Sequence, residues 1–281
     1  MTTPRILITN DDGIDAPGLR HLARAAARQG LDIVVAAPLT EASGTSAAMT
    51  AVEKNGKIVV SQRELPGVRN VPAYAVAASP AFIVLLALRS AFGPPPQIVL
   101  SGINRGANAG AAVVHSGTVG ATLTASHAGL HGLAISLDVL SPANGTAASG
   151  GQAIADLEHA DDENRHWDSA AGLAMKLLPT LTHTPPGTVL NVNVPDLHVD
   201  GIRGLRRATL ARFGQVQMSI AEAGEGFVRT AVQAADEPLE PGTDLAALAE
   251  GFAVVTPIRS PAEATDVKFN LESIVVQTPA I

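Results

Sequence analysis

The sequence predicts an α/β fold, a three-layer sandwich in which helices cover both faces of a mostly parallel sheet, with a strand-rich extension at the C-terminal end. Short apolar runs recur along the first two thirds of the chain, and helix-like segments separate them. A strand-helix-strand repeat of this kind implies parallel strands with right-handed crossovers. The extension is predicted because the periodicity changes beyond Pro195.

The first unit runs from a strand to a helix and back to a strand. An apolar strand over residues 5–9 ends in a polar turn. A helix should follow, with Asp15 as its N-cap, Pro17 in its first turn and Gly30 at its end. The second strand is expected over 32–37. Further strands are predicted over 97–101, 133–137 and 189–194, and further helices over 81–91, 120–128 and 167–178.

We expect the chain to divide at Pro195. Residues 1–195 would form the catalytic core, with an exposed insertion over 141–165 that is rich in Gly, Ala, Ser and acidic residues. Residues 196–281 would form a β-hairpin or arm for oligomerisation, because exposed strand edges tend to be paired. A homodimer or homotetramer is therefore predicted. Strands of the extension are expected over 201–213, 226–232 and 252–256.

Composition excludes several classes of protein. A net charge of -7 and only 3% aromatic residues disfavour binding to duplex or single-stranded nucleic acid and to anionic membranes. The absence of cysteine excludes disulfides, thiolate metal sites and a cysteine nucleophile. The longest apolar run is far below the roughly 20 residues that span a bilayer. The N-terminal segment lacks secretory signal features, so we expect a cytoplasmic protein.

Three polar loops should meet at the carboxyl edge of the sheet, where open parallel sheets bind ligands. The first loop carries Asp11 and Asp12, whose adjacent carboxylates repel each other unless a divalent cation stabilises both. Ser43 and Asn104, in the other two loops, would add neutral oxygens, a donor set that favours Mg²⁺ or Mn²⁺ over zinc. The alternative is that one acid caps the next helix while the other faces water.

A phosphate site is expected where small residues over 106–110 and 115–120 lead into a helix start. Free backbone N–H groups at such a start can bind an anion. His115 could serve there as a general acid, a general base or a substrate contact, although an isolated loop histidine more often has no catalytic role. A flexible N-cap with glycines is the simpler alternative for the whole segment.

Other phosphate and nucleotide motifs are missing from the sequence. There is no P-loop, no G-x-S-x-G elbow and no G-x-G-x-x-G dinucleotide fingerprint, which disfavours a dehydrogenase. Gly13 stands two residues after Asp11, where an aspartyl-phosphate mechanism would need a second aspartate.

Six segments together resemble one known family. They are ILITNDDGIDAPGL, APLTEASG, SGINRGAN, HSGTVGAT, LNVNVPD and GTDLAALAEGFAVVTPI. In order and approximate spacing they resemble the SurE survival protein family of metal-dependent nucleotidases. The resemblance covers most of the chain and implies a Rossmann-like core, a C-terminal arm that forms dimers or tetramers, and hydrolysis of nucleoside 5′- and 3′-monophosphates.

The resemblance also implies roles for individual residues. The family's metal ligands, for one Mg²⁺ or Mn²⁺ per subunit, correspond to Asp11, Asp12, Ser43 and Asn104. Its phosphate contacts correspond to Asn108, Ser116, Gly117 and Thr118, and we expect Asn10, Gly44 and His115 to complete the substrate site. Asp11, Asp12 and Asn104 are the expected catalytic residues.

The chain departs from the family pattern beside this centre. Leu39 to Ala42 replace a charged stretch, Ala111 and Ala112 replace an acidic pair, and His115 replaces a tyrosine. The leading hypothesis is a metal-dependent phosphomonoesterase, for which Asp12, a metal-activated hydroxide and His115 are the candidate general bases. The alternative is a weak or inactive metal- and nucleotide-binding protein.

Overall fold

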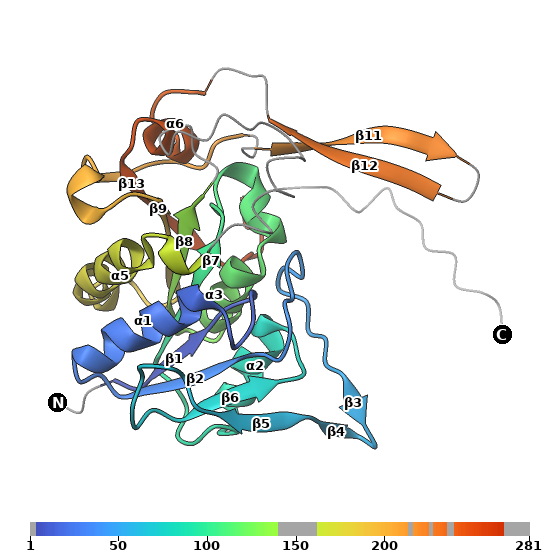
Figure 1. Ribbon diagram of the computed structural model, residues 1–281, viewed down its shortest axis with the longest axis vertical. Coiled ribbons are helices and arrows are strands. Elements are labelled where there is room, and N and C mark those ends of the chain that lie inside the picture. The colour runs from blue at the N-terminus through green and yellow to red at the C-terminus, as the bar shows by residue number, and fades with distance from the viewer. Residues whose placement is uncertain (1–3, 140–161, 213–215, 225–226, 235–238, 267–281) are drawn as a thin grey trace.

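The computed structural model describes residues 4–139, 162–212, 216–224, 227–234 and 239–266 of the 281-residue chain. A nine-stranded mixed sheet forms its centre, and helices cover both faces (Figure 1). Helices α1 and α5 pack against one face, and α2 and α3 against the other. The α/β fold predicted from the sequence is confirmed.

The strands of the sheet are β1 (Ile6–Thr9), β2 (Ile33–Pro38), β5 (Val60–Arg63), β6 (Ala73–Val76), β7 (Ile98–Arg105), β8 (His131–Asp138), β9 (Thr188–Pro195), β10 (Leu205–Arg207) and β13 (Ala253–Arg259). Their order across the sheet is β10-β13-β9-β8-β7-β1-β2-β6-β5. The six strands from β9 to β6 run parallel, while β5 and β13 are antiparallel to β6 and β9. The carboxyl ends of the six parallel strands therefore lie at one edge.

The helices are α1 (Pro17–Arg28), α2 (Pro80–Leu88), α3 (Gly117–His127), α5 (Trp167–Thr182) and α6 (Asp244–Ala249). Short 3₁₀ turns cover η1 (Gly110–His115), η3 (Asp162–Asn164) and η4 (Val199–Gly201). Two small ribbons stand apart from the sheet, β3 (Glu53–Lys54) with β4 (Lys57–Ile58), and β11 (Val216–Gly224) with β12 (Phe227–Ala234). Within the described ranges, no helix has both the length and the apolar run that crossing a bilayer requires.

The side chains of β1 point alternately to the two faces of the sheet, and each face has its own hydrophobic core. Ile6 and Ile8 belong to the core beneath α1 and α5, whereas Leu7 belongs to the core beneath α2 and α3. All three side chains are fully buried. Because successive strand residues point to opposite faces, a central strand covered on both sides must be apolar throughout.

Several boundaries differ from the expectations: the helix expected over 81–91 ends at Leu88, the helix expected over 167–178 continues to Thr182, and the strand expected over 97–101 continues to Arg105. Two differences concern helix starts. The residue that caps α1 is Ala16, not Asp15, which is exposed. Helix α3 begins at Gly117, three residues before the predicted start at Gly120. Its two glycines weaken the helical pattern, but the Ser116 hydroxyl accepts a 3.0 Å hydrogen bond from the Val119 N–H and so caps the earlier start.

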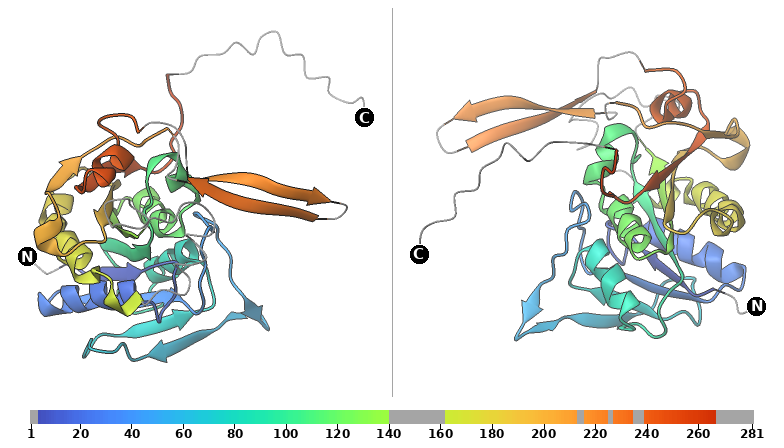
Figure 2. Two further views of the ribbon diagram at one scale, coloured as in Figure 1. Left: turned by 45° about the horizontal axis from the view of Figure 1, so that its top comes forward. Right: turned by 180° about the vertical axis from the view of Figure 1, so that it is seen from behind.

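The chain beyond Pro195 contributes to the main sheet as well as to an arm. β10 and β13 extend the sheet past β9, with the short helix α6, absent from the predictions, between them in sequence. A strand was expected over 201–213, of which the structure describes residues 201–212, and within these only Leu205–Arg207 is a strand. β11 and β12 form an antiparallel hairpin that projects from the body (Figure 2). The division at Pro195 stays a prediction, and residues 141–161 of the expected insertion lie outside the described residues.

Helix α1 approaches the sheet unusually closely at Gly18. A Cβ atom there would lie 2.1 Å from the Ile103 carbonyl oxygen and 3.1 Å from the Trp167 ring. Gly18 therefore permits the contact among α1, β7 and α5. Gly172, within α5, is a helical glycine whose Cβ position meets nothing within 4 Å.

We expect Gly18→Ala to destabilise the protein by about 1–3 kcal/mol, because overpacking outweighs the roughly 1 kcal/mol gain in helix propensity. Gly172→Ala is the matched control and should be neutral or stabilising by up to about 1 kcal/mol. Urea unfolding monitored by circular dichroism measures both. Equal effects of the two substitutions would contradict the close approach described at Gly18.

Candidate active site

The acidic pair lies in the loop between β1 and α1, at the carboxyl edge of the sheet. Only 3% of Asp11 is exposed, and its Oδ1 accepts a hydrogen bond from the Thr118 hydroxyl at the start of α3. The same hydroxyl oxygen lies 3.3 Å from Asn104 Oδ1, at the end of β7. Oxygens of Asp11, Asn104 and Thr118 therefore converge from three segments that are far apart in sequence.

A glycine makes this convergence possible. A Cβ atom on Gly117 would lie 2.8 Å from both Cβ and Oδ2 of Asp11. The Asp11 carboxylate thus packs directly against the first turn of α3, whose N–H groups and helix dipole favour negative charge. Any side chain at position 117 would separate the acidic loop from the helix.

Burial dominates the electrostatics of the pair. It raises the pKa of Asp11 above its ordinary range, while hydrogen bonds from Thr118 and from the backbone of Gly117 oppose the rise. Burial together with the neighbouring Asp11 carboxylate raises the pKa of Asp12 to about 8. Two carboxylates in such a place are poorly compensated by the protein, and a bound cation would stabilise both as anions.

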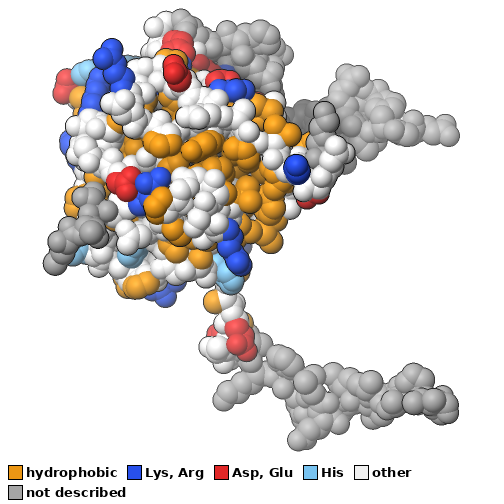
Figure 3. Space-filling view, turned by 90° about the horizontal axis from the view of Figure 1, so that it is seen from below, with side chains coloured by type: hydrophobic (Ala, Val, Ile, Leu, Met, Phe, Trp, Pro, Cys, Tyr) orange, Lys and Arg blue, Asp and Glu red, His pale blue; other side chains and the backbone are white. Residues whose placement is uncertain are grey.

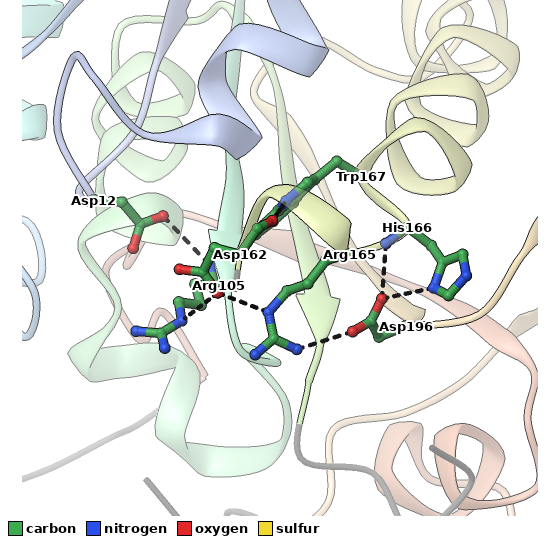
Figure 4. Close-up of polar contacts among 7 residues, drawn as sticks. All are labelled: Asp12, Arg105, Asp162, Arg165, His166, Trp167 and Asp196. Carbon is green, nitrogen blue, oxygen red and sulfur yellow. Dashed lines mark hydrogen bonds and ion pairs between the residues drawn. The ribbon is translucent and has the colours of Figure 1, made fainter. Parts of the chain in front are cut away.

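Asp12 begins a chain of polar contacts that runs away from the loop (Figure 4). Its Oδ2 accepts a 3.3 Å hydrogen bond from the Arg105 N–H, and the Arg105 Nε lies 3.2 Å from Asp162. Asp162 also pairs with Arg165, which in turn pairs with Asp196 at 3.0 Å. These contacts fix the end of β7, and therefore the segment that carries Asn104.

The donors fit a hard divalent cation. Two carboxylates and the Asn104 amide oxygen are all oxygen ligands, and the Asn104 amide is oriented by its Nδ2, which donates to the Gly106 carbonyl at 2.7 Å. Among the described residues, no group of three or more His, Asp or Glu side chains forms an alternative metal cluster.

Three expected site residues are exposed. The Ser43 side chain is exposed, and its hydroxyl donates a 2.6 Å hydrogen bond to Glu41 instead of contacting the acidic pair. His115 is exposed at the end of η1, just before the Ser116 N-cap. Gly44, in the same loop as Ser43, is also exposed and has a positive φ of 73°.

Two further expected residues shape loops. Asn10 is fully buried and forms two hydrogen bonds with the backbone of Gly13, 2.9 Å and 3.2 Å long, which close the turn that presents the acidic pair. Asn108 donates from its Nδ2 to the Ser136 hydroxyl at 2.9 Å. Both side chains therefore stabilise the loops in this structure.

Three buried polar residues near the site were not predicted as site residues from the sequence. Asn193 accepts from the Asn108 N–H at 2.7 Å and donates to its carbonyl at 3.0 Å, and Asn191 donates to the same carbonyl at 2.8 Å. Asp244, at the start of α6, accepts from the Gly110 N–H at 2.8 Å. All three are fully buried. The sequence indicated the buried role of Asn191 and Asn193, because these two asparagines interrupt the apolar run VLNVNV.

Comparisons with known proteins agree with this geometry. The family model described as survival protein SurE matches residues 6–219. A 5′/3′-nucleotidase SurE of Shigella dysenteriae serotype 1 is 32% identical over 267 residues, which cover 91% of this chain and 90% of that protein. A 5′/3′-nucleotidase SurE of Escherichia coli O1:K1 is 32% identical over 266 residues, covering 90% and 89% of the two chains.

A solved structure extends the comparison to the fold. The crystal structure of the SurE protein from Aquifex aeolicus superposes with a TM-score of 0.70 at 26% identity, covering 94% of this chain and 96% of that one. The match to the family model includes the acidic loop and reaches residue 219. The chain therefore belongs to the SurE survival protein family.

Proposed function

We propose that this protein is a phosphoric monoester hydrolase that converts nucleoside 5′- and 3′-monophosphates to nucleoside and phosphate, with one Mg²⁺ or Mn²⁺ held by Asp11, Asp12 and Asn104. Relatives named 5′/3′-nucleotidase support the activity. Ser43 would join the ligands if its hydroxyl turned from Glu41. The relatives favour this function over a protein that only binds metal and nucleotide.

The observation that carries the proposal is the contact between the acidic pair and the start of α3. A carboxylate pair attracts a cation, and a helix start attracts an anion. Asp11 touches both Gly117 and Thr118. A phosphate that bridges a cation and the N–H groups of a helix start would find both partners here.

A bound divalent cation would polarise the phosphoryl group and make a water molecule more acidic. The chain's own residues do the rest. In this structure the Thr118 hydroxyl and the N–H groups of Gly117 and Thr118 bond the Asp11 carboxylate. Once a cation held that carboxylate, these donors would be free to stabilise the charge that develops on the phosphoryl oxygens. Ser116 keeps this turn in place as the N-cap. Asp12 and His115 are the candidates on this chain for accepting the proton of the attacking water.

Asn191, Asn193 and Asp244 act in this proposal as positioning residues. They hold the backbone of Asn108 and Gly110, which leads into the phosphate-binding turn.

The dimer or tetramer and the cytoplasmic location expected from the sequence remain predictions. Light scattering at micromolar protein concentration measures the mass of the particle and so tests the oligomeric state.

Asp11→Asn should abolish most activity while the fold survives, because it removes one negative charge from the cation site but little volume. A loss of several kcal/mol of cation binding corresponds to roughly 10²-fold or more at a fixed Mn²⁺ concentration. Phosphate release from nucleoside monophosphates, with Mn²⁺ or with EDTA, measures the effect. Asp15→Asn, an exposed acid on the same loop, is the control. If Asp11→Asn kept the wild-type rate, the acidic pair would serve only to stabilise a helix terminus and would not hold a catalytic cation.

Stability of the metal-free protein should fall as pH rises from about 4 to about 8. The raised pKa values of Asp11 and Asp12 mean that the folded state retains protons that the unfolded state releases in this window. Affinity for Mg²⁺ should rise over the same window, because protons compete with the cation. Thermal unfolding with and without Mg²⁺ measures both trends, and Asp12→Asn should flatten them. Stability that rises with pH would refute the assignment.

Asn193→Ala should lower the free energy of unfolding by about 1–3 kcal/mol, because it leaves the partly buried backbone of Asn108 incompletely paired. Turnover should fall with it, while Mg²⁺ affinity stays near wild type. Asn191→Ala removes one of these hydrogen bonds and should have the smaller effect on turnover. Urea unfolding, steady-state kinetics and Mg²⁺ titration separate the two effects. Wild-type turnover in Asn193→Ala would exclude the positioning role.

A further inference from the structure

A groove of about 570 Å³ lies along helix α5, and we call it the α5 groove. Four of its lining residues are three or four positions apart and so share one face of the helix. They are Ser169, Gly172, Leu173 and Lys176. Of the described residues that line the groove, none belongs to the acidic pair or to the phosphate-binding turn. The groove is therefore a separate cavity, and its volume suits a small organic molecule.

Apolar side chains form much of the wall. Val199 and Leu205 line the groove and are exposed by 51% and 43%. Leu173 and Ile202 are half-buried and pack against the core beneath α1 and α5. A Cβ atom on Gly172 would meet nothing within 4 Å. An apolar molecule can therefore lie along α5 at this glycine without displacing a side chain.

Exposed apolar surface alone does not identify a ligand site on this protein. Large exposed hydrophobic residues such as Met49 and Val52 lie outside the α5 groove. Hydrophobic side chains also gather on the face of the molecule seen from below (Figure 3). In the α5 groove, basic side chains stand among the apolar ones, and this combination indicates the chemistry of a ligand.

Lys176 supplies the free positive charge of the groove. It is exposed and forms no ion pair with any described residue. Asp168 is the one acid among the described lining residues, and it pairs with His21 of α1 at 2.7 Å. A carboxylate, sulfonate or phosphate group of a ligand would supply the countercharge that the protein does not give to Lys176.

Arg165 joins the groove to the active site. Its side chain lines the groove and pairs with Asp162 at 2.7 Å and with Asp196 at 3.0 Å. Asp162 is also the partner of Arg105, whose backbone N–H donates to Asp12 (Figure 4). An anion in the groove would compete with the two aspartates for the Arg165 guanidinium. Loosening the pair of Arg165 with Asp162 would weaken the support of the β7 end that holds Asp12.

We propose that the α5 groove is a regulatory site for a small organic anion with an apolar body, such as a medium-chain carboxylate, and that its occupation weakens cation binding at the acidic pair. The anionic group would lie near Lys176 and Arg165, and the apolar body along Gly172 and Leu173. A net charge of -7 favours a free small molecule over an anionic membrane surface. The regulatory half of the inference rests on the proposed cation site, whereas the binding half does not.

Filling the groove tests where the anion binds. Binding is measured on the metal-free protein by the fluorescence of anilinonaphthalene sulfonate and its displacement by octanoate. Octanoate should displace this probe at least fivefold more tightly than octanol, which has the same chain without the charge. Gly172→Leu should weaken octanoate binding at least tenfold, and Thr180→Leu, at an exposed position of α5 outside the groove, is the matched control.

Removing the free charge tests the preference for an anion and serves if Gly172→Leu does not fold. Lys176→Gln should weaken octanoate binding about fivefold and leave octanol binding within twofold of wild type. Lys57→Gln, which changes an exposed lysine outside the groove, is the control. If octanoate bound the groove variants as tightly as the wild type, or bound the wild type without saturation, the inference would fail.

Calorimetric titration tests the link to the acidic pair. Saturating octanoate should lower the Mg²⁺ affinity at least threefold, and Mg²⁺ should lower the octanoate affinity by the same factor, because linkage is reciprocal. Asp162→Asn interrupts the chain of contacts outside the groove. It should keep octanoate binding within twofold of wild type and bring the coupling factor to about one.

The outcomes separate this inference from the proposed function. If the wild type bound no Mg²⁺, the proposed function and the regulatory role would both fail, whereas the octanoate titrations would still decide whether the groove binds the anion. Octanoate binding that the groove variants lose, but that leaves Mg²⁺ affinity unchanged, would overturn the regulatory role. A changed particle mass of Gly172→Leu with octanoate binding retained would assign the groove to a contact between subunits and overturn the whole inference.

Discussion

The hydrogen bond from Thr118 to Asp11 unites the site, because it joins the loop after β1 to the first turn of α3. The carboxylate takes the place at a helix start that an anion favours. Burial makes that arrangement costly for a lone charge, as the raised pKa of Asp11 indicates. A divalent cation and a phosphate together would balance the charges better than the protein does alone. The local electrostatics of the buried acidic pair therefore favour a bound cation.

Small residues maintain the distances on which this arrangement depends. Gly117 lets α3 touch Asp11, and Gly120 lets the loop after β2 touch α3. Gly102, within β7, has a φ of 136°, and a Cβ atom there would lie 2.2 Å from the Ile135 carbonyl oxygen. At each position the glycine permits an approach that a side chain would prevent. Gly117 meets the Asp11 side chain, while Gly120 and Gly102 meet backbone, so the geometry of the site depends on glycine at all three positions.

Local sequence patterns predicted the parallel core and the acidic pair, since apolar strands and polar strand ends are local features. They did not predict the start of α3, because glycine has low helix propensity and the cap that compensates is a single hydroxyl. The contribution of β10 and β13 to the main sheet was also missed, since the periodicity of a strand does not identify its partner. Ser43 is an example within the site, because the local sequence did not identify the partner of its hydroxyl. Its loop position was evident, but its hydroxyl pairs with Glu41 through a side-chain orientation that no spacing encodes.

The hydrogen bond between Asp244 and Gly110 spans 134 positions of the chain. During synthesis from the N-terminus, the acidic loop, β7 and α3 emerge long before this carboxylate does. The turn that leads into α3 acquires its last buried partner only when α6 has been made and has docked. Completion of the catalytic centre is therefore tied to near-completion of the polypeptide, so that a truncated chain lacking α6 would carry the acidic pair without the full support of the turn opposite it.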